Sequence, residues 1–251
     1  MPTRRPFPSG RETANRTPAK AEALAKELGG TVCPNAEAAE KAELLFLGVK
    51  PQGLPGLAGE LAPVLQARKG NAPVVVSMAT AVTLRELDAM LGGGLPLIRI
   101  MPNPPAAVGA GTILYAAQNV TDAQLNAFRA VLAQAGLLLP LPEEKIDAAS
   151  AISGCGPAFC FQFADALALG GVRAGLSYPD ACRLAAQTML GAAEMLLQGG
   201  EAPDVLKMRV CSPAGTTIEG VLALEQGGFS YTVQNAVTAA YRRTVEMTRK
   251  G

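Results

Sequence analysis

The chain has 251 residues, 49% of them hydrophobic, and a formal net charge of +1. This length can bury a sizeable core in one large domain or two small ones, and the near balance of charge favours neither nucleic acid nor an anionic membrane surface as a partner. Because the chain contains no histidine, Ser-His-Asp and Cys-His nucleophile systems and His-ligated metal centres are excluded.

The first half of the chain alternates between helical and strand-like segments. A helix over 19–28, rich in Ala, Glu, Lys and Leu, ends at Gly29-Gly30. Apolar runs of the type that is buried on both faces of a parallel sheet predict strands at 44–49, 74–78, 97–100, 112–115 and 137–141. Helical stretches near 54–67, 83–91 and 122–135 separate them. This alternation predicts a right-handed, mostly parallel α/β sheet.

After Glu143 the pattern becomes entirely helical. We expect helices over 144–152, 157–174, 179–198, 202–210, 216–226 and 230–249. The stretch 179–198 is apolar on much of its circumference, which indicates burial against other helices or a second subunit. The sequence therefore predicts an α/β domain over 1–143 followed by an all-α domain over 144–251.

Two loops of small and hydroxylated residues precede predicted helices. They are Ser153-Gly154-Cys155-Gly156-Pro157-Ala158 and Cys211-Ser212-Pro213-Ala214-Gly215-Thr216-Thr217. A helix start leaves backbone N–H groups without partners and carries partial positive charge, so it can bind an anion. Small residues let a ligand approach that backbone. Together the loops indicate a site for a small carboxylate; the alternative is two ordinary capped helix starts.

The loops that follow the predicted strands are typical of doubly wound folds, which bind ligands at the carboxyl ends of their strands. A dinucleotide-binding fold also begins with an apolar strand and a glycine fingerprint. Residues 1–10 contain three prolines and two adjacent arginines instead, and such a segment cannot form a central strand. We therefore expect the sheet to lack its first strand.

The run Asn15-Arg16-Thr17 stands where the second strand of such a fold would end. This position faces the adenosine ribose, and an arginine there suits a 2′-phosphate. The alternative is a helix N-cap with a solvated arginine beside it.

With these pieces in order, the chain resembles the pyrroline-5-carboxylate reductase family from about Asn15 to Arg249. The matching runs are Asn15-Arg16-Thr17, Val49-Lys50-Pro51, Met101-Pro102-Asn103, Ser153–Ala158 and Ser212–Thr217. The resemblance implies a Rossmann-like domain that binds NADP or NAD. It also implies a helical domain that forms a homodimer or a higher homo-oligomer.

The resemblance further implies roles for individual residues. Those expected near the adenosine phosphate are Asn15, Arg16 and Thr17, and those expected along the rest of the cofactor groove are Asn35, Val49, Lys50, Ala79 and Asn103. The substrate carboxylate would be held by Gly215, Thr216 and Thr217, with Ser212 shaping the loop and Glu143 as a further substrate-side candidate. No metal is implied.

The implied reaction transfers hydride to the imine carbon of 1-pyrroline-5-carboxylate and gives L-proline. An iminium ion accepts hydride readily, so no strong general acid is required, which agrees with a chain without histidine. Positioning of substrate and cofactor is then the main task of the protein. Thr217 is the catalytic candidate, as a hydrogen-bond partner of the ring nitrogen; helix capping is the alternative. Lys50 either neutralises phosphate or substrate charge or is an ordinary surface lysine.

The chain departs from the family pattern at several points. The glycine fingerprint for the pyrophosphate is missing, and Pro104 stands where the family usually has threonine. Alanine replaces the usual glycine at Ala81 and Ala214, and Cys155 replaces serine.

These departures leave three other hypotheses open. One is a related NADP-dependent reductase of another imine or a β-hydroxyacid. Another is an inactive, truncated chain that only dimerises. The third is a misassigned start codon, which inspection of the upstream DNA would reveal.

The cysteine pattern and the N-terminal segment indicate a cytoplasmic protein. The five cysteines are scattered and odd in number, as expected of reduced thiols. Hydrophobic runs such as Leu44 to Val49 are too short to cross a bilayer. The first sixteen residues carry four arginines but no apolar core, which argues against a signal peptide, and a transit peptide is the less favoured alternative.

Overall fold

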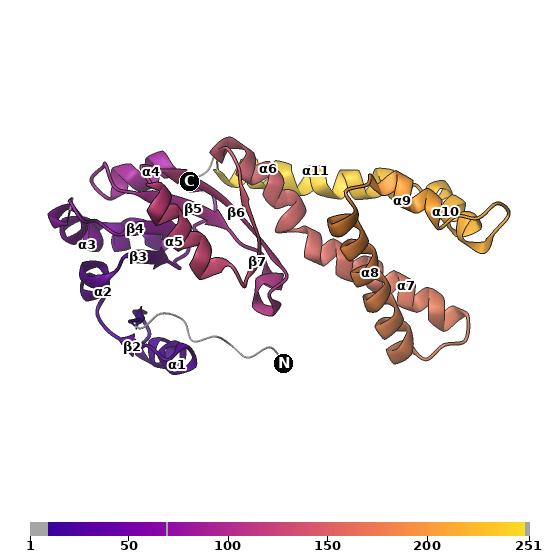
Figure 1. Ribbon diagram of the computed structural model, residues 1–251, viewed down its shortest axis with the longest axis horizontal. Coiled ribbons are helices and arrows are strands. Elements are labelled where there is room, and N and C mark those ends of the chain that lie inside the picture. Colours follow the sequence, from indigo (N-terminus) through magenta and orange to yellow (C-terminus); the bar gives the residue numbers. More distant parts are fainter. Residues whose placement is uncertain (1–9, 69, 249–251) are drawn as a thin grey trace. The chain divides into compact units, whose positions relative to one another are not determined.

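The computed structural model describes residues 10–68 and 70–248 (Figure 1). The chain divides into two compact units. The first comprises the residues up to Ser150 and those from Thr244 onward, and the second spans Ala151–Arg243. The α/β architecture lies in the first unit, and the second unit is helical throughout.

The main sheet of the first unit has five strands in sequential order. They are β3 (Leu44–Leu47), β4 (Val74–Ser77), β5 (Leu97–Met101), β6 (Gly111–Gln118) and β7 (Gly136–Pro140). The pairs β3–β4, β4–β5 and β6–β7 are parallel, which confirms the predicted mostly parallel sheet. The pair β5–β6 is antiparallel, because the connection from Met101 to Gly111 is too short for the crossover that parallel strands need.

A separate two-stranded parallel sheet consists of β1 (Glu12–Thr13) and β2 (Thr31–Val32), joined through α1 (Pro18–Leu28). A short helix, α2 (Asn35–Lys41), then leads into β3. Among the described residues no strand pairs with both β1 and β3, so two separate sheets result. The prediction that residues 1–10 form no central strand falls almost wholly outside the described residues. The sequence pattern did not predict β2 or α2, both of which are short.

Helices and sheet enclose a core on both faces of the main sheet. The helices that follow β3, β4 and β6 are α3 (Leu54–Ala67), α4 (Leu84–Met90) and α5 (Asp122–Leu132), and the 3-10 turns are η1 (Pro51–Gly53) and η2 (Pro104–Val108). Alternate strand residues face opposite sides: Val75 and Leu97 pack with α3 and α4, whereas Val76 and Ile98 pack with Phe128 of α5. The loops after β3, β4 and β5 therefore extend from a rigid, buried platform.

Within the described part of the chain six helices follow β7, as predicted. They are α6 (Glu143–Ser153), α7 (Gly156–Arg173), α8 (Tyr178–Gly199), α9 (Pro203–Arg209), α10 (Thr216–Gln226) and α11 (Phe229–Thr248). The helices α7 and α8 form a hairpin, in which a Cβ on Gly171 would lie 3.1 Å from the Cβ of Ala181. No strand occurs after Glu143 among the described residues.

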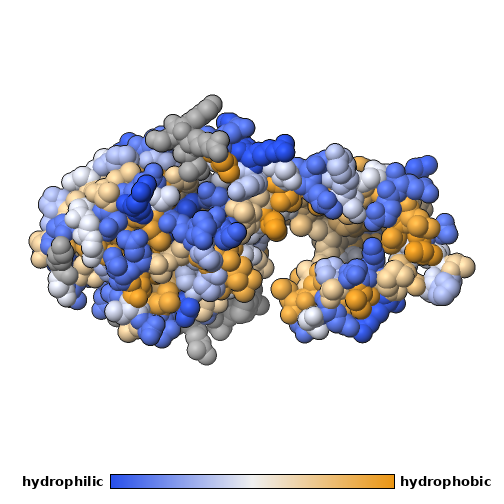
Figure 2. Space-filling view, turned by 90° about the horizontal axis from the view of Figure 1, so that it is seen from above, coloured by the Kyte–Doolittle hydropathy of each residue, from blue (hydrophilic) through white to orange (hydrophobic). Residues whose placement is uncertain are grey.

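The helical unit exposes many large apolar side chains. Figure 2 shows hydrophobic residues gathered on its surface. Phe161, Leu197 and Tyr231 are each more than 70% exposed, and only two residues of α8, Ala181 and Ala185, are buried. Helices of the same chain therefore bury the stretch 179–198 only in part. A second subunit is the other partner that the sequence pattern predicts for it.

One helical stretch, Glu143–Arg173, is long and apolar enough to cross a membrane by length and composition alone. It is not a single helix, since α6 ends at Ser153 and α7 begins at Gly156. A single stretch of this kind is weak evidence for a membrane span.

Candidate functional site

The loops predicted to line the cofactor groove follow three neighbouring parallel strands. Val49 and Lys50 follow β3, Ala79 follows β4 and Asn103 follows β5. Because the carboxyl ends of parallel strands lie at one edge of a sheet, these loops share the edge at which doubly wound folds bind ligands. Ala79 is buried and its N–H donates to Ser77 Oγ at 3.3 Å, whereas Lys50 is exposed.

Arg16 reaches the first of these loops. Thr17 N–H donates to Asn15 Oδ1 at 2.9 Å, which fixes the turn before α1. A Cβ on Gly53 would lie 4.0 Å both from Arg16 Nη2 and from the Cβ of Val49. The side chains of Arg16 and Val49, which the resemblance had assigned to one groove, therefore both lie near Gly53.

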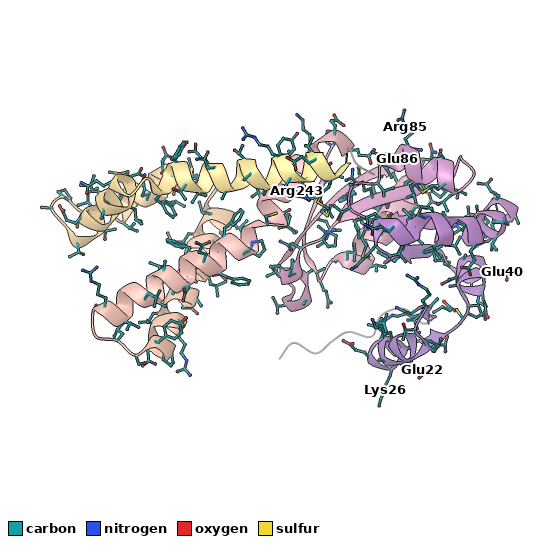
Figure 3. The ribbon with its side chains drawn as sticks, turned by 180° about the vertical axis from the view of Figure 1, so that it is seen from behind. Glu22, Lys26, Glu40, Arg85, Glu86 and Arg243 are labelled. Carbon is teal, nitrogen blue, oxygen red and sulfur yellow. The ribbon has the colours of Figure 1, made fainter. Side chains whose placement is uncertain are left out.

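The helix that follows Arg16 presents a buried side and an exposed side. Ala21 and Ala25 of α1 are buried, and Glu22 and Lys26 point outward from it (Figure 3). The side chain of Thr17 makes no capping hydrogen bond, although Thr17 is the N-cap residue of α1. The Thr17 hydroxyl thus accepts no hydrogen bond from the first backbone N–H groups of α1.

The amide side chains of Asn35 and Asn103 both make contacts within the protein. Asn35 Nδ2 donates to Glu60 Oε2 at 3.0 Å, which ties α2 to α3. Asn103 Oδ1 accepts the backbone N–H of Thr112 at 2.8 Å, which holds the loop after β5 against β6. These bonds orient both side chains, and their roles toward a cofactor stay predictions.

The loop before α10 carries the predicted carboxylate ligands. Gly215 N–H donates to the carbonyl oxygen of Ser212 at 3.0 Å, and α10 begins at Thr216 without a side-chain cap. Ser212, Thr216 and Thr217 are exposed. The first-turn N–H groups and three hydroxyl groups are thus gathered in one short segment, which is suited to an anion.

The other loop of small residues joins α6 to α7. Cys155 precedes the first residue of α7, Pro157 occupies its first turn, and Ala158 N–H donates to the carbonyl oxygen of Cys155 at 3.0 Å. The loop is thus a helix start, as the sequence predicts.

Two alanines adopt the left-handed backbone conformation. Ala81 has φ of 63° and Ala214 has φ of 56°. These are the two positions at which the family resemblance led us to expect glycine, the residue that accepts this conformation without strain. One of them follows the β4 loop, and the other lies in the loop before α10.

Glu143 lies at the first turn of α6 and contacts α4 and β5. Its Oε1 accepts the backbone N–H of Leu84 at 2.7 Å and lies 3.4 Å from Arg99 Nη1. Sequence reasoning did not single out Arg99, because an arginine within an apolar strand carries no motif of its own.

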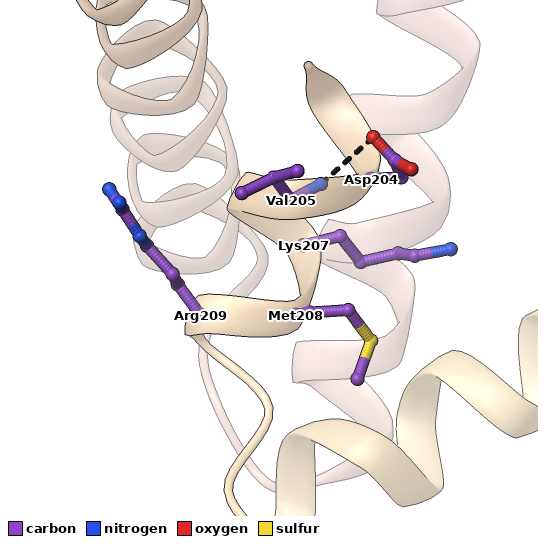
Figure 4. A pocket seen from close by; sticks show the side chains of 5 residues that line it. All are labelled: Asp204, Val205, Lys207, Met208 and Arg209. Carbon is purple, nitrogen blue, oxygen red and sulfur yellow. Dashed lines mark hydrogen bonds between the residues drawn. The ribbon is translucent and has the colours of Figure 1, made fainter. Parts of the chain in front are cut away.

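One open hollow lies away from these residues. It measures about 670 Å³ and is lined by Asp204, Val205, Lys207, Met208 and Arg209 of α9 (Figure 4). None of the predicted site residues borders it. The described residues also hold no cluster of three or more His, Cys, Asp or Glu that could bind a metal.

An α/β sheet with loops at its carboxyl edge, followed by a helical unit, is typical of dinucleotide-dependent oxidoreductases. Residues 11–81 match the family profile described as NADP oxidoreductase, coenzyme F420-dependent, and residues 143–247 match pyrroline-5-carboxylate reductase dimerisation. The chain is 41% identical over 220 residues to pyrroline-5-carboxylate reductase of Synechocystis sp., covering 86% of this chain and 79% of the relative. It belongs to the pyrroline-5-carboxylate reductase family.

Other relatives agree. The chain is 39% identical over 215 residues to pyrroline-5-carboxylate reductase of Pseudomonas aeruginosa, covering 85% of this chain and 77% of that one. The solved pyrroline-5-carboxylate reductase of Coxiella burnetii superposes with a TM-score of 0.86 at 32% identity, over 94% of this chain and 87% of that one. The Plasmodium falciparum pyrroline carboxylate reductase with NADP bound gives 0.77 at 30% identity, over 87% and 82%.

Proposed function

We propose that this chain reduces 1-pyrroline-5-carboxylate to L-proline with NADPH. The observation that carries the proposal is 41% identity to a pyrroline-5-carboxylate reductase over 220 residues. The loop before α10 supports it, because its exposed hydroxyl groups and helix start suit the carboxylate that this substrate bears.

The residues present fit the two ends of a dinucleotide. Arg16, whose side chain lies near Gly53 as that of Val49 does, provides a cation for the adenosine phosphate, with Asn15 and Thr17 in the same turn. Lys50, Ala79 and Asn103 lie in the loops at the carboxyl edge of the sheet, and Asn35 stands at the start of α2. The described residues contain no glycine-rich turn between a first strand and its helix to receive the pyrophosphate.

The bound cofactor would supply hydride to the imine carbon while the C=N electron pair moves to the protonated nitrogen. In the proposal Gly215 and Thr216 hold the substrate carboxylate through the α10 helix start, and Ser212 shapes the loop. Thr217 hydrogen-bonds the ring nitrogen with its hydroxyl and fixes its orientation. Positioning of this kind can contribute several kcal/mol to the rate. The resemblance also made Glu143 a substrate-side candidate.

We also propose that the chain forms a homodimer through its helical domain, with 1–143 and 144–251 as the two domains. The exposed apolar side chains of α7, α8 and α11 support this, as does the match of 143–247 to a dimerisation family. A cytoplasmic location is in keeping with five free cysteines. Light scattering on the purified chain should give the mass of a dimer or a multiple of it.

The test of the activity is NADPH-dependent reduction of pyrroline-5-carboxylate by the purified 251-residue chain, followed as loss of NADPH absorbance. Proline formation at enzyme rates is the expected result. A folded dimer that neither consumes NADPH nor forms proline would instead support the alternative of a chain that only dimerises. Reduction of a β-hydroxyacid precursor but not of pyrroline-5-carboxylate would instead support the alternative of a related NADP-dependent reductase with a different substrate.

A further inference from the structure

A buried arginine lies near the end of β5, which leads into the loop that carries Asn103. The side chain of Arg99, on β5, is only 4% exposed. Its Nη2 donates to Asp147 Oδ1 at 2.7 Å, and its Nη1 lies 3.4 Å from Glu143 Oε1. Its Nε is buried and has no hydrogen-bond partner. A buried charge is tolerated only when it is paired, so Arg99 depends on the two carboxylates of α6.

The contacts connect three elements of the first unit. Arg99 belongs to β5, whose loop carries Asn103. Glu143 and Asp147 belong to α6, and Glu143 Oε1 also accepts the N–H of Leu84 in the first turn of α4, which follows the loop with Ala79. One carboxylate therefore connects β5 and the start of α4 to the first turn of α6.

Apolar packing brings the same elements together. Leu97 lies two residues before Arg99 on the same face of β5, and it belongs to one buried cluster with Leu84 of α4 and Ile146 of α6. Packing of this kind is not directional. The arginine and its carboxylates add direction, because their hydrogen bonds require particular atoms at particular distances.

We propose that Arg99 is a positioning residue, which acts through Glu143 and Asp147 to hold the β4 and β5 loops and the start of α6 in one arrangement. On this proposal, which rests on the proposed function for its catalytic consequence, Glu143 acts through Arg99 and Leu84 and does not touch the substrate.

The test compares Glu143→Gln with Glu144→Gln in the full-length protein. The glutamine at 143 removes one of the two negative charges that pair with Arg99, and its neutral amide oxygen accepts the Leu84 N–H more weakly than the carboxylate does. Glu144, the next residue of α6, is exposed and serves as a matched control. We expect kcat to fall about tenfold in Glu143→Gln, because small displacements of positioning groups have large effects on rate. The KM for pyrroline-5-carboxylate should change less than about twofold, since the proposal places no substrate contact there.

Asp147→Asn and the double variant Glu143→Gln/Asp147→Asn complete the test. Because both carboxylates act through one arginine, the two losses of kcat should not add. A rise in KM with kcat unchanged would overturn the proposal and return Glu143 to the substrate site. A fall in thermal stability with kcat and KM both unchanged would reduce the cluster to a structural role.

Hydrogen exchange separates this proposal from the proposed function. Exchange of the Leu84 amide and of the amides in the loop after β5 should accelerate in both Glu143→Gln and Asp147→Asn, but not in Glu144→Gln. If the wild-type chain shows no turnover, the proposed function fails. The hydrogen-exchange rates of these amides then test the positioning role of Arg99 without any kinetic measurement. Unchanged exchange at both places would overturn it.

Discussion

The hydroxyl of Ser212 fills the space that a side chain on Gly215 would need. A Cβ on Gly215 would overlap Ser212 Oγ and would lie 3.1 Å from the Ser212 carbonyl oxygen. That same carbonyl accepts the N–H of Gly215 at 3.0 Å, so the loop before α10 closes tightly on itself. A side chain at position 215 therefore requires the Ser212 hydroxyl to move, although the φ of −84° is open to any residue.

We expect Gly215→Ala to lower kcat/KM for pyrroline-5-carboxylate about tenfold or more, because the Ser212 hydroxyl must turn away and the loop must widen. Ser212→Ala/Gly215→Ala should recover part of this loss, since it removes the overlapping oxygen. The measurement is a double-mutant cycle in steady-state kinetics. Strictly additive losses would show that the overlap is not the cause.

Thr217→Ala should lower kcat/KM by roughly tenfold or more, equivalent to about 1.4 kcal/mol of transition-state stabilisation. The reason is the loss of the hydroxyl group proposed to orient the ring nitrogen of the substrate. Thr217→Ser keeps the hydroxyl and is the control, with expected kinetics within about threefold of wild type. If both variants lose the same activity, or neither does, the hydroxyl has no catalytic role.

Arg16→Gln should raise the KM for NADPH about tenfold and leave that for NADH nearly unchanged, because only NADPH carries the phosphate that the guanidinium would pair with. Lys20→Gln, an exposed charge neutralisation on α1, is the control. Initial rates measured over a range of NADPH and of NADH concentrations give the two KM values for each variant. An equal effect of both variants would point to general electrostatic attraction instead of a specific phosphate contact.

Local patterns were sufficient to predict most elements of the fold. The apolar runs at 44–49, 74–78 and 97–100 became β3, β4 and β5 at nearly the predicted bounds, because a fully buried strand must be apolar along its whole length. The elements at 31–32 and 35–41 were missed, since two to seven residues are too few for a period to show.

Only part of the candidate site could be predicted from such local patterns. Motifs at loops and helix starts can be recognised from residue types alone, as at Ser212 and Thr217. The role of Arg99 depends on the pairing of β5 with its neighbours and on the position of α6. No short window of sequence contains that information, because its carboxylate partners lie more than forty residues further along the chain.

Ala81→Gly and Ala214→Gly should each stabilise the protein by about 0.5–1 kcal/mol. An alanine in the left-handed region carries a strain of about 1–2 kcal/mol, and the greater freedom of glycine in the unfolded chain offsets about 0.4–1 kcal/mol of the gain. Ala133→Gly is the control, because Ala133 has φ of −56° and should lose stability on the same change. Urea unfolding of the three variants measures the differences, and destabilisation at 81 and 214 would contradict the strain argument.

The helix starts of α4 and α5 provide a matched pair for pH dependence. Thr83 and Glu86 form a capping box at α4, in which Thr83 N–H donates to Glu86 Oε2 at 2.8 Å. Thr121 and Gln124 form the same box at α5, with Thr121 N–H donating to Gln124 Oε1 at 3.0 Å. Only the first contains a group that can be protonated.

Hydrogen bonds from the backbone and the side chain of Thr83 lower the pKa of Glu86 below its ordinary value. A carboxyl group whose pKa is lower in the folded state contributes stability that is present above its unfolded pKa and is lost as the pH falls through the folded value. Because Glu86 is largely solvated, the contribution should stay below about 1 kcal/mol. Thr83→Ala should therefore destabilise the protein by about 1 kcal/mol at neutral pH and by less in acid, whereas Thr121→Ala should cost the same at both. Urea unfolding at neutral pH and again below the ordinary pKa of a glutamate measures this, and an equal pH dependence of the two variants would contradict it.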